Sequence, residues 1–336
     1  MTGWWDIDPE ASIRTWKQFN TLGQGAAYGN QWLLIGPWGH TTNYPTSTGQ
    51  FDFPTGSGDL HNPHAVPYDW HGPNFVMSTL GRDETYVPPA KRVRVYFVGE
   101  EGNTTEPQNT WYDLDDWPPP TLSETTLWLD GTQMLVGAAP AAGALNWDCD
   151  PLSPLPTVGG ANFESGAPFP IQAGPYDQSV IPDSSAQLKF SMAPLSFDWP
   201  MAGPFKCVLY VATDAADTDV MAKLIDVYPD GREMIVTDST VRLSWYLAQQ
   251  GLGAVVPGTT YEVQLEIGQR AWVFAAGHRL ELWLQSSNYP RFAVNPGNGD
   301  TFLNETGSNG VVQHNTLQLG AGFESRLVLP LYDPRS

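Results

Sequence analysis

The first forty residues combine a helical pattern with a buried-strand pattern. Asp8 is a suitable N-cap and Pro9 suits a first helical position, so a helix is expected to begin just after Asp6. Apolar residues then recur at helical spacing, at Ile13, Trp16, Phe19 and Leu22. The nearly continuous apolar run at 31–36 favours a strand buried on both faces of a parallel sheet. His40 follows this strand and is expected in a loop at its C-terminal end.

The second half of the chain has the pattern of an antiparallel β-sandwich. Short apolar or alternating runs are separated by turns, and Asp230-Gly231 between two of them predicts a hairpin. We interpret this region as a jelly roll. The expected strands lie at 127–129, 207–211, 222–227, 261–265 and 279–284.

The change in pattern divides the chain into two units. Its 336 residues are enough for two domains. Another strand is expected at 93–98, a short helix at 70–80 and a functional loop or lid at 41–66, where no periodicity exists. After Trp117-Pro118-Pro119-Pro120 the pattern changes to the short apolar or alternating runs of the second half. We therefore predict one domain at 1–120 and a second at 121–336.

Composition excludes some classes of partner. The net charge of −20 reflects 16 basic against 36 acidic residues, and no basic stripe exists for nucleic acid. No apolar run is long enough to span a membrane, and the N-terminal residues lack a signal-peptide pattern. A soluble protein is expected, with secretion and cytoplasmic location both open. Cys149 and Cys207 are expected to be small buried hydrophobes, and their redox state stays open.

Asp6 and His40 are the candidate catalytic residues. In α/β hydrolases the acid and then the histidine of the triad follow the serine along the chain, each in a loop after a strand. Asp6 and His40 have this order and these expected positions. From spacing alone, two other roles are also open: Asp6 could be a helix cap, and His40 could be a solvated loop residue.

The residues around the pair carry a resemblance to a known family. The stretches 3–6 (Gly-Trp-Trp-Asp) and 34–40 (Leu-Ile-Gly-Pro-Trp-Gly-His) resemble the acid and histidine motifs of the Xaa-Pro dipeptidyl-peptidase and cocaine esterase family. The resemblance implies the C-terminal remnant of an α/β-hydrolase domain followed by a jelly-roll β-sandwich. Further similar blocks lie at 117–120, 148–151, 156–160, 174–178, 214–219, 223–232, 276–280 and 286–292.

The resemblance implies a serine hydrolase that cleaves amide or ester bonds of a small molecule or peptide through an acyl-enzyme. Asp6 would orient His40. The sequence departs from the family because it has no Gly-x-Ser-x-Gly, so we expect an N-terminally truncated and catalytically incomplete chain. The strand before Asp6 is expected to be missing, which would leave the strand at 31–36 as an exposed apolar edge. Self-association or a partner chain is expected to cover this edge.

Two alternatives and several residue roles stay open. The sandwich could be a non-catalytic binding or interaction module, or Ser47 or Ser57 could act as a nucleophile without an elbow. Peptidase and esterase activity are not distinguished. No cofactor or metal is expected. The candidate aromatics of a substrate pocket are Trp4, Trp5, Trp38 and Trp70. A solvated loop is expected to contain His61, His64 and His71. Roles in turns and hydrogen bonds are expected for His278, Asp214, Asp217 and Asp219.

Overall fold

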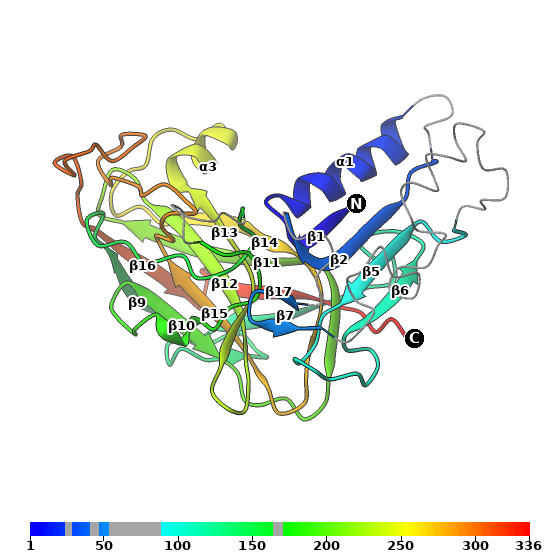
Figure 1. Ribbon diagram of the computed structural model, residues 1–336. Coiled ribbons are helices and arrows are strands. Elements are labelled where there is room, and N and C mark those ends of the chain that lie inside the picture. Colours follow the sequence, from blue (N-terminus) through cyan, green and yellow to red (C-terminus); the bar gives the residue numbers. More distant parts are fainter. Residues whose placement is uncertain (24–28, 41–46, 54–88, 164–170) are drawn as a thin grey trace.

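The computed structural model of the chain is shown in Figure 1. It describes residues 1–23, 29–40, 47–53, 89–163 and 171–336. The helix expected at 70–80 lies outside the described residues. So do Trp70, Ser57, His61, His64 and His71.

The N-terminal unit is a small sheet with one crossover helix. Its strand order is β1-β2-β5-β6, where β1–β2 and β2–β5 pair in parallel and β6 is antiparallel to β5. Parallel neighbours require a crossover connection, which α1 provides between β1 and β2. The expected strands at 31–36 and 93–98 are confirmed. The elements are β1 (Thr2–Trp5), α1 (Pro9–Leu22), β2 (Leu33–Gly39), β5 (Val93–Phe97) and β6 (Thr110–Leu114).

Helix α1 begins as the sequence predicts but buries fewer side chains. The Asp8 carboxylate accepts from the Ala11 backbone N–H at 3.0 Å, which caps the helix. Ile13 and Trp16 are buried, whereas Phe19 and Leu22 are exposed. Steps of three residues turn about 300° around a helix, so the apolar positions drift off the buried face. Among the described residues, no helix is both long and apolar enough to cross a membrane.

The prediction that the strand at 31–36 forms an exposed edge is wrong. Residues 2–5 form β1, the strand that was expected to be missing, and β2 lies between β1 and β5. Within the described part of the chain, β1 pairs only with β2 and forms the edge of this sheet. All four β1 residues are buried, in spite of this edge position.

Two antiparallel sheets form the second unit, as the alternating pattern predicts. The smaller has the order β10-β15-β12-β13, and the larger has the order β8-β7-β17-β11-β16-β9 with β14 also paired to β11. The predicted Asp230-Gly231 hairpin joins β12 to β13, and Gly231 adopts a positive φ of 94° there. The strands are β7 (Ser123–Leu129), β8 (Leu135–Val136), β9 (Gly143–Cys149), β10 (Gln187–Ser191), β11 (Trp199–Thr213), β12 (Asp219–Val227), β13 (Glu233–Arg242), β14 (Tyr261–Phe274), β15 (Arg279–Gln285), β16 (Gln313–Leu319) and β17 (Arg326–Leu331).

One hydrophobic core runs through both units. It includes Trp4 and Val95 of the N-terminal sheet together with Phe205 and Trp272 of the sandwich. A parallel bridge joins Val98 to Trp272. The predicted boundary at residue 120 falls between β6 and β7. The division into two domains at this position stays a prediction.

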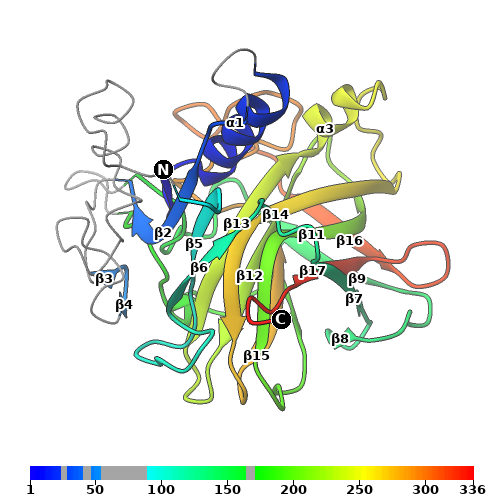
Figure 2. The same cartoon turned by 90° about the vertical axis from the view of Figure 1, so that its right-hand side faces the viewer.

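The short elements lie around these sheets. The remaining elements are β3 (Ser47–Thr48), β4 (Phe51–Asp52), the 3-10 turn η3 (Gln178–Val180) and α3 (Leu243–Gln249). Helices α1 and α3 are both at the top of the molecule in the two views of Figures 1 and 2.

Both cysteines, Cys149 and Cys207, are free and buried, as expected. Burial raises the pKa of each thiol to about 12.

Candidate catalytic site

Asp6 lies in the short connection between β1 and α1. Its backbone N–H donates to the Gly3 carbonyl at 3.1 Å. Its Oδ1 accepts from the Ile7 backbone N–H at 2.7 Å, and its Oδ2 accepts from the Thr2 hydroxyl at 3.3 Å. These bonds fix the orientation of a carboxylate whose side chain is 23% exposed.

His40 follows β2, and its ring faces Asp6. The two strands are parallel neighbours, so the residues after their C-terminal ends meet at one edge of the sheet. His40 Nδ1 lies 2.7 Å from Asp6 Oδ1. A carboxylate can only accept, so neutral His40 carries its proton on Nδ1 and leaves Nε2 as a base. The structure therefore brings together the two residues selected from the sequence.

Three of the four predicted pocket aromatics are core residues. Trp4 and Trp5 are fully buried and Trp38 is 4% exposed. The Trp38 ring packs onto Gly36, where an added Cβ would lie 1.9 Å from a ring carbon. These rings support the strands that precede Asp6 and His40, and their contact with a substrate stays a prediction.

A hollow of about 440 Å³ is lined by Ile7, the residue after Asp6, and by Phe163, whose ring contacts His40. The Phe163 ring, from a loop of the second unit, lies 5.3 Å from the His40 ring between centroids. Phe163 is 53% exposed, and Ile7 borders the same hollow. Phe163 could not be selected from the sequence, because a single aromatic after the loop residues 159–162 has no periodicity or motif. The lining residues are Ile7, Ala161, Asn162, Phe163, Ile171, Pro290, Arg291 and Phe292.

Arg291, the charged residue that lines this hollow, is held in place by the buried carboxylate of Asp238. Arg291 Nη1 forms an ion pair with Asp238 Oδ1, and Asn288 donates to Asp238 Oδ2 at 2.9 Å. The Arg291 backbone N–H donates to the Thr157 hydroxyl at 3.1 Å. These contacts anchor the segment that carries Pro290 to Phe292 along one side of the hollow.

His278 and the acidic residues Asp214, Asp217 and Asp219 form internal hydrogen bonds in separate parts of the sandwich, as expected. His278 is 1% exposed, and its Nδ1 lies 2.8 Å from Asp226 Oδ1. Burial disfavours the imidazolium, but the Asp226 and Glu100 carboxylates together outweigh burial and raise the pKa of His278. Asp219 pairs with Arg242 at 2.9 Å. Asp217 accepts from the Ser244 hydroxyl, and Asp214 accepts from the His314 backbone N–H.

Comparison with known families identifies the larger part of the chain. Residues 89–328 match the family described as the X-Pro dipeptidyl-peptidase C-terminal non-catalytic domain. The chain belongs to this family. The resemblance drawn from the sequence motifs is thereby confirmed. The match to the X-Pro dipeptidyl-peptidase C-terminal family begins before β5, so it includes two strands of the N-terminal sheet as well as most of the sandwich.

Nearly the whole chain aligns with a known esterase. The cocaine esterase of Rhodococcus sp. (strain MB1 Bresler) is 27% identical over 342 aligned positions, which cover 98% of this chain and 55% of the esterase. The chain thus spans about half the length of this relative. Asp6 and His40 lie outside the X-Pro dipeptidyl-peptidase C-terminal match at 89–328.

Solved structures share the fold. An aminopeptidase from a marine sediment archaeon, Thaumarchaeota archaeon, superposes with a TM-score of 0.82 at 21% identity, covering 98% of this chain and 54% of that one. An alpha-amino acid ester hydrolase superposes with a TM-score of 0.75 at 21% identity over the same shares of the two chains. At these identities the likeness concerns the fold of both units.

Proposed function

We propose that this chain is the acid- and base-bearing part of a serine hydrolase that cleaves ester or amide bonds through an acyl-enzyme. The observation that carries the proposal is the 2.7 Å contact between Asp6 Oδ1 and His40 Nδ1 after two adjacent parallel strands. In this interpretation the N-terminal sheet is the remnant of an α/β-hydrolase domain, and the β-sandwich is its jelly-roll domain.

The geometry suits general base and then general acid catalysis by His40. Asp6 keeps the Nδ1 proton in place, so Nε2 can accept the proton of a serine hydroxyl as that oxygen attacks the carbonyl carbon. The resulting imidazolium faces the Asp6 carboxylate and is stabilised by it. His40 then returns the proton to the leaving alcohol or amine.

The proposal assigns the nucleophilic serine to a segment outside these 336 residues. The chain contains no Gly-x-Ser-x-Gly, and it corresponds to 55% of the length of the cocaine esterase. We propose that this segment, as a partner chain or within a longer polypeptide, adds a strand beside β1. The corrected sheet order favours β1 for this role, because β1 is the edge strand among the described residues.

The hollow beside His40 suggests an apolar acyl group in the substrate. Ile7, Phe163 and Phe292 supply apolar surface to it. Ester and amide substrates both fit this interpretation.

A serine within the described residues has less support. No described serine hydroxyl donates to His40. Ser47 lies exposed in the two-residue strand β3, with no sharp strand-to-helix turn that would project its hydroxyl. Ser57 lies outside the described residues.

A fluorophosphonate probe tests the assignment of the nucleophile. The chain alone is expected to stay unlabelled. A chimera in which the chain replaces the homologous segment of the Rhodococcus cocaine esterase is expected to be labelled and to hydrolyse p-nitrophenyl esters. Labelling of the chain alone would contradict the external serine. Ester turnover in the chimera that survives His40→Ala would contradict the role of His40.

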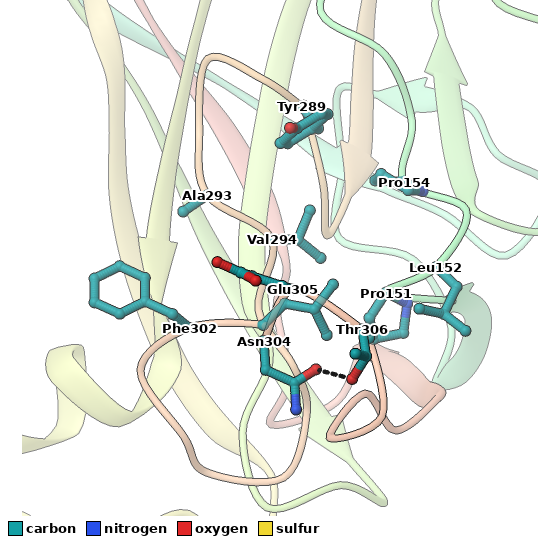
Figure 3. A pocket seen from close by; sticks show the side chains of 12 residues that line it. Pro151, Leu152, Pro154, Tyr289, Ala293, Val294, Phe302, Asn304, Glu305 and Thr306 are labelled. Carbon is teal, nitrogen blue, oxygen red and sulfur yellow. Dashed lines mark hydrogen bonds between the residues drawn. The ribbon is translucent and has the colours of Figure 1, made fainter.

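A binding module is the second candidate, because aromatic rings border another hollow on the sandwich. This hollow of about 470 Å³ lies between Tyr289, Phe302 and the Pro151–Pro154 segment (Figure 3). Tyr289 is 51% exposed and Phe302 is 66% exposed. Exposed rings beside amide and carboxylate groups can bind sugars by stacking and hydrogen bonding. Figure 3 also shows Asn304 and Glu305 at this hollow.

Glycan-array binding tests this second candidate. Binding that persists in His40→Ala and falls at least about tenfold in Phe302→Ala would support it. Phe323→Ala is the matched control, since Phe323 is 40% exposed and packs on Tyr210 elsewhere on the sandwich. Equal binding by the Phe302 and Phe323 variants, or no binding at all, would contradict a ligand in this hollow.

A further inference from the structure

Strand β14 of the sandwich contacts both elements that flank Asp6. Glu10, in the first turn of α1, accepts from the Gln269 backbone N–H at 3.1 Å and from Arg270 Nη1 at 3.2 Å. The Arg270 guanidinium also lies 5.9 Å from the centroid of the Trp4 ring in β1. Asp6 thus lies between a strand and a helix that the same arginine contacts. Figure 2 shows α1 above the end of the sandwich where β13 and β14 lie.

The backbone of β14 is shaped for this contact. The register with β11 shifts between Phe205, which pairs with Gly268, and Lys206, which pairs with Glu266, so β14 bulges at Ile267. Gly268 has a φ of 146°, which side chains rarely adopt. A Cβ at Gly268 would lie 2.2 Å from the Thr237 hydroxyl oxygen and 3.1 Å from Glu10 Oε1. The glycine therefore leaves room for the Glu10 carboxylate to approach the strand.

Burial makes the Glu10–Arg270 pair a strong constraint. The Arg270 side chain is 2% exposed, and Glu10 is the carboxylate with which it pairs among the described residues. Its Nε donates to the Val236 carbonyl at 3.2 Å and its Nη1 to the Gln269 carbonyl at 2.7 Å. Removing one partner of such a pair leaves an uncompensated buried charge. The pair therefore fixes the start of α1 against β14.

The start of α1 in turn determines where Asp6 can lie. Only Ile7 and Asp8 separate Asp6 from the helix, and Asp8 is bound as its N-cap. We propose that Arg270 and Glu10 are positioning residues, which hold α1 so that the Asp6 carboxylate stays in contact with His40 Nδ1. The catalytic meaning of this inference rests on the proposed function. The positioning itself can be measured without turnover.

The tautomer of His40 is the readout, because a purely structural role would not change it. The full chain is labelled with ¹⁵N-histidine, and the His40 signals are assigned by comparison with His40→Gln. In the parent chain the neutral ring is expected to carry its proton on Nδ1. In Glu10→Ala, long-range ¹H–¹⁵N spectra are expected to show the Nδ1–H to Nε2–H ratio falling about fivefold or more. Glu10→Gln keeps an acceptor oxygen and is expected to restore most of the ratio.

Controls separate this effect from loss of fold. Glu124→Ala removes an exposed carboxylate that pairs with Lys206 at 3.0 Å on the sandwich, and it is expected to leave the His40 ratio unchanged. The His314 signal, held by Asp148 at 2.8 Å, is an internal reference for the folded sandwich. Arg270→Met is expected to reproduce the Glu10→Ala spectrum. If Glu10→Ala, which leaves the buried Arg270 unpaired, fails to fold, Arg270→Met decides the question, because the Glu10 carboxylate that it leaves unpaired is 30% exposed.

The outcomes distinguish the two proposals. An unchanged His40 ratio in folded Glu10→Ala would overturn the positioning role while leaving the proposed function in place. A His40 ring that already carries its proton on Nε2 in the parent chain would contradict the Asp6–His40 pair on which both depend. A shifted ratio together with an inactive chimera would support positioning and contradict the proposed hydrolase.

Discussion

Replacing Asp6 with asparagine in the chimeric hydrolase is expected to lower kcat by about 10⁴-fold with little change in KM. The Asn side chain has nearly the size of Asp, but its amide can donate to His40 Nδ1. The neutral ring would then carry its proton on Nε2, where the serine proton must be accepted. The imidazolium would also lose the opposing charge that lies 2.7 Å away in the present structure. Initial rates with p-nitrophenyl esters give both constants.

Asp8→Asn is the matched control for this loss. Asp8 lies two residues further along, caps α1 through the Ala11 N–H at 3.0 Å, and makes no hydrogen bond to His40. Asparagine caps helices about as well as aspartate, so this variant is expected to keep kcat within about twofold. Comparable losses in both variants would mean that disturbance of the loop, rather than the tautomer of His40, causes the effect. A kcat retained in Asp6→Asn would remove Asp6 from the mechanism.

The local sequence was sufficient to select Asp6 and His40 and to begin α1 at Pro9. Capping chemistry and a continuous apolar strand act over a few residues, so they can be read directly from the chain. The motifs around the pair were sufficient to identify the family. The strand at residues 2–5 was not predicted, because four residues carry too little pattern to show that they form a strand. Their burial depends on α1, β2 and the sandwich packing around them.

Contacts between distant segments could not be predicted from the sequence. Phe163 reaches the His40 ring from a loop more than 120 positions away, and Arg270 meets Glu10 across 260 positions. Neither residue lies in a periodic run that indicates its partner. The burial of Trp4, Trp5 and Trp38 follows from the same packing, in which the N-terminal sheet and the sandwich share one core. Aromatic content alone could not distinguish core rings from pocket rings.

Lys223 is expected to make the stability of the chain rise steeply with pH in the alkaline range. It lies in β12 with no exposed surface, and its ammonium donates to the Gln178 amide oxygen at 3.1 Å. The nearby Asp238 carboxylate already pairs with Arg291. Burial lowers the pKa of Lys223 from 10.5 to about 8, and the Asp238 carboxylate acts in the opposite direction without cancelling it. The unfolded chain therefore binds one more proton than the folded chain between these two pH values.

The free energy of unfolding must rise with pH wherever the unfolded state binds more protons. The Lys223 contribution is therefore most unfavourable below pH 8 and is relieved as pH rises to about 10.5. A shift of this size corresponds to about 3 kcal/mol. Lys223→Met keeps the length of the side chain but removes the titrating group. The difference in unfolding free energy, parent minus variant, is thus expected to grow by about 3 kcal/mol from pH 7 to pH 10.5.

Urea unfolding of both proteins at several pH values between 7 and 10.5 measures this difference. The loss of the hydrogen bond to Gln178 adds an offset that does not depend on pH, and other titrating groups are common to both proteins. Lys206→Met is the control, because its side chain is 42% exposed and pairs with Glu124 at the surface. Its difference from the parent is expected to stay nearly constant over the same range. A constant difference for Lys223→Met as well would mean that Lys223 keeps its charge in the folded protein up to the pH at which the unfolded chain loses it.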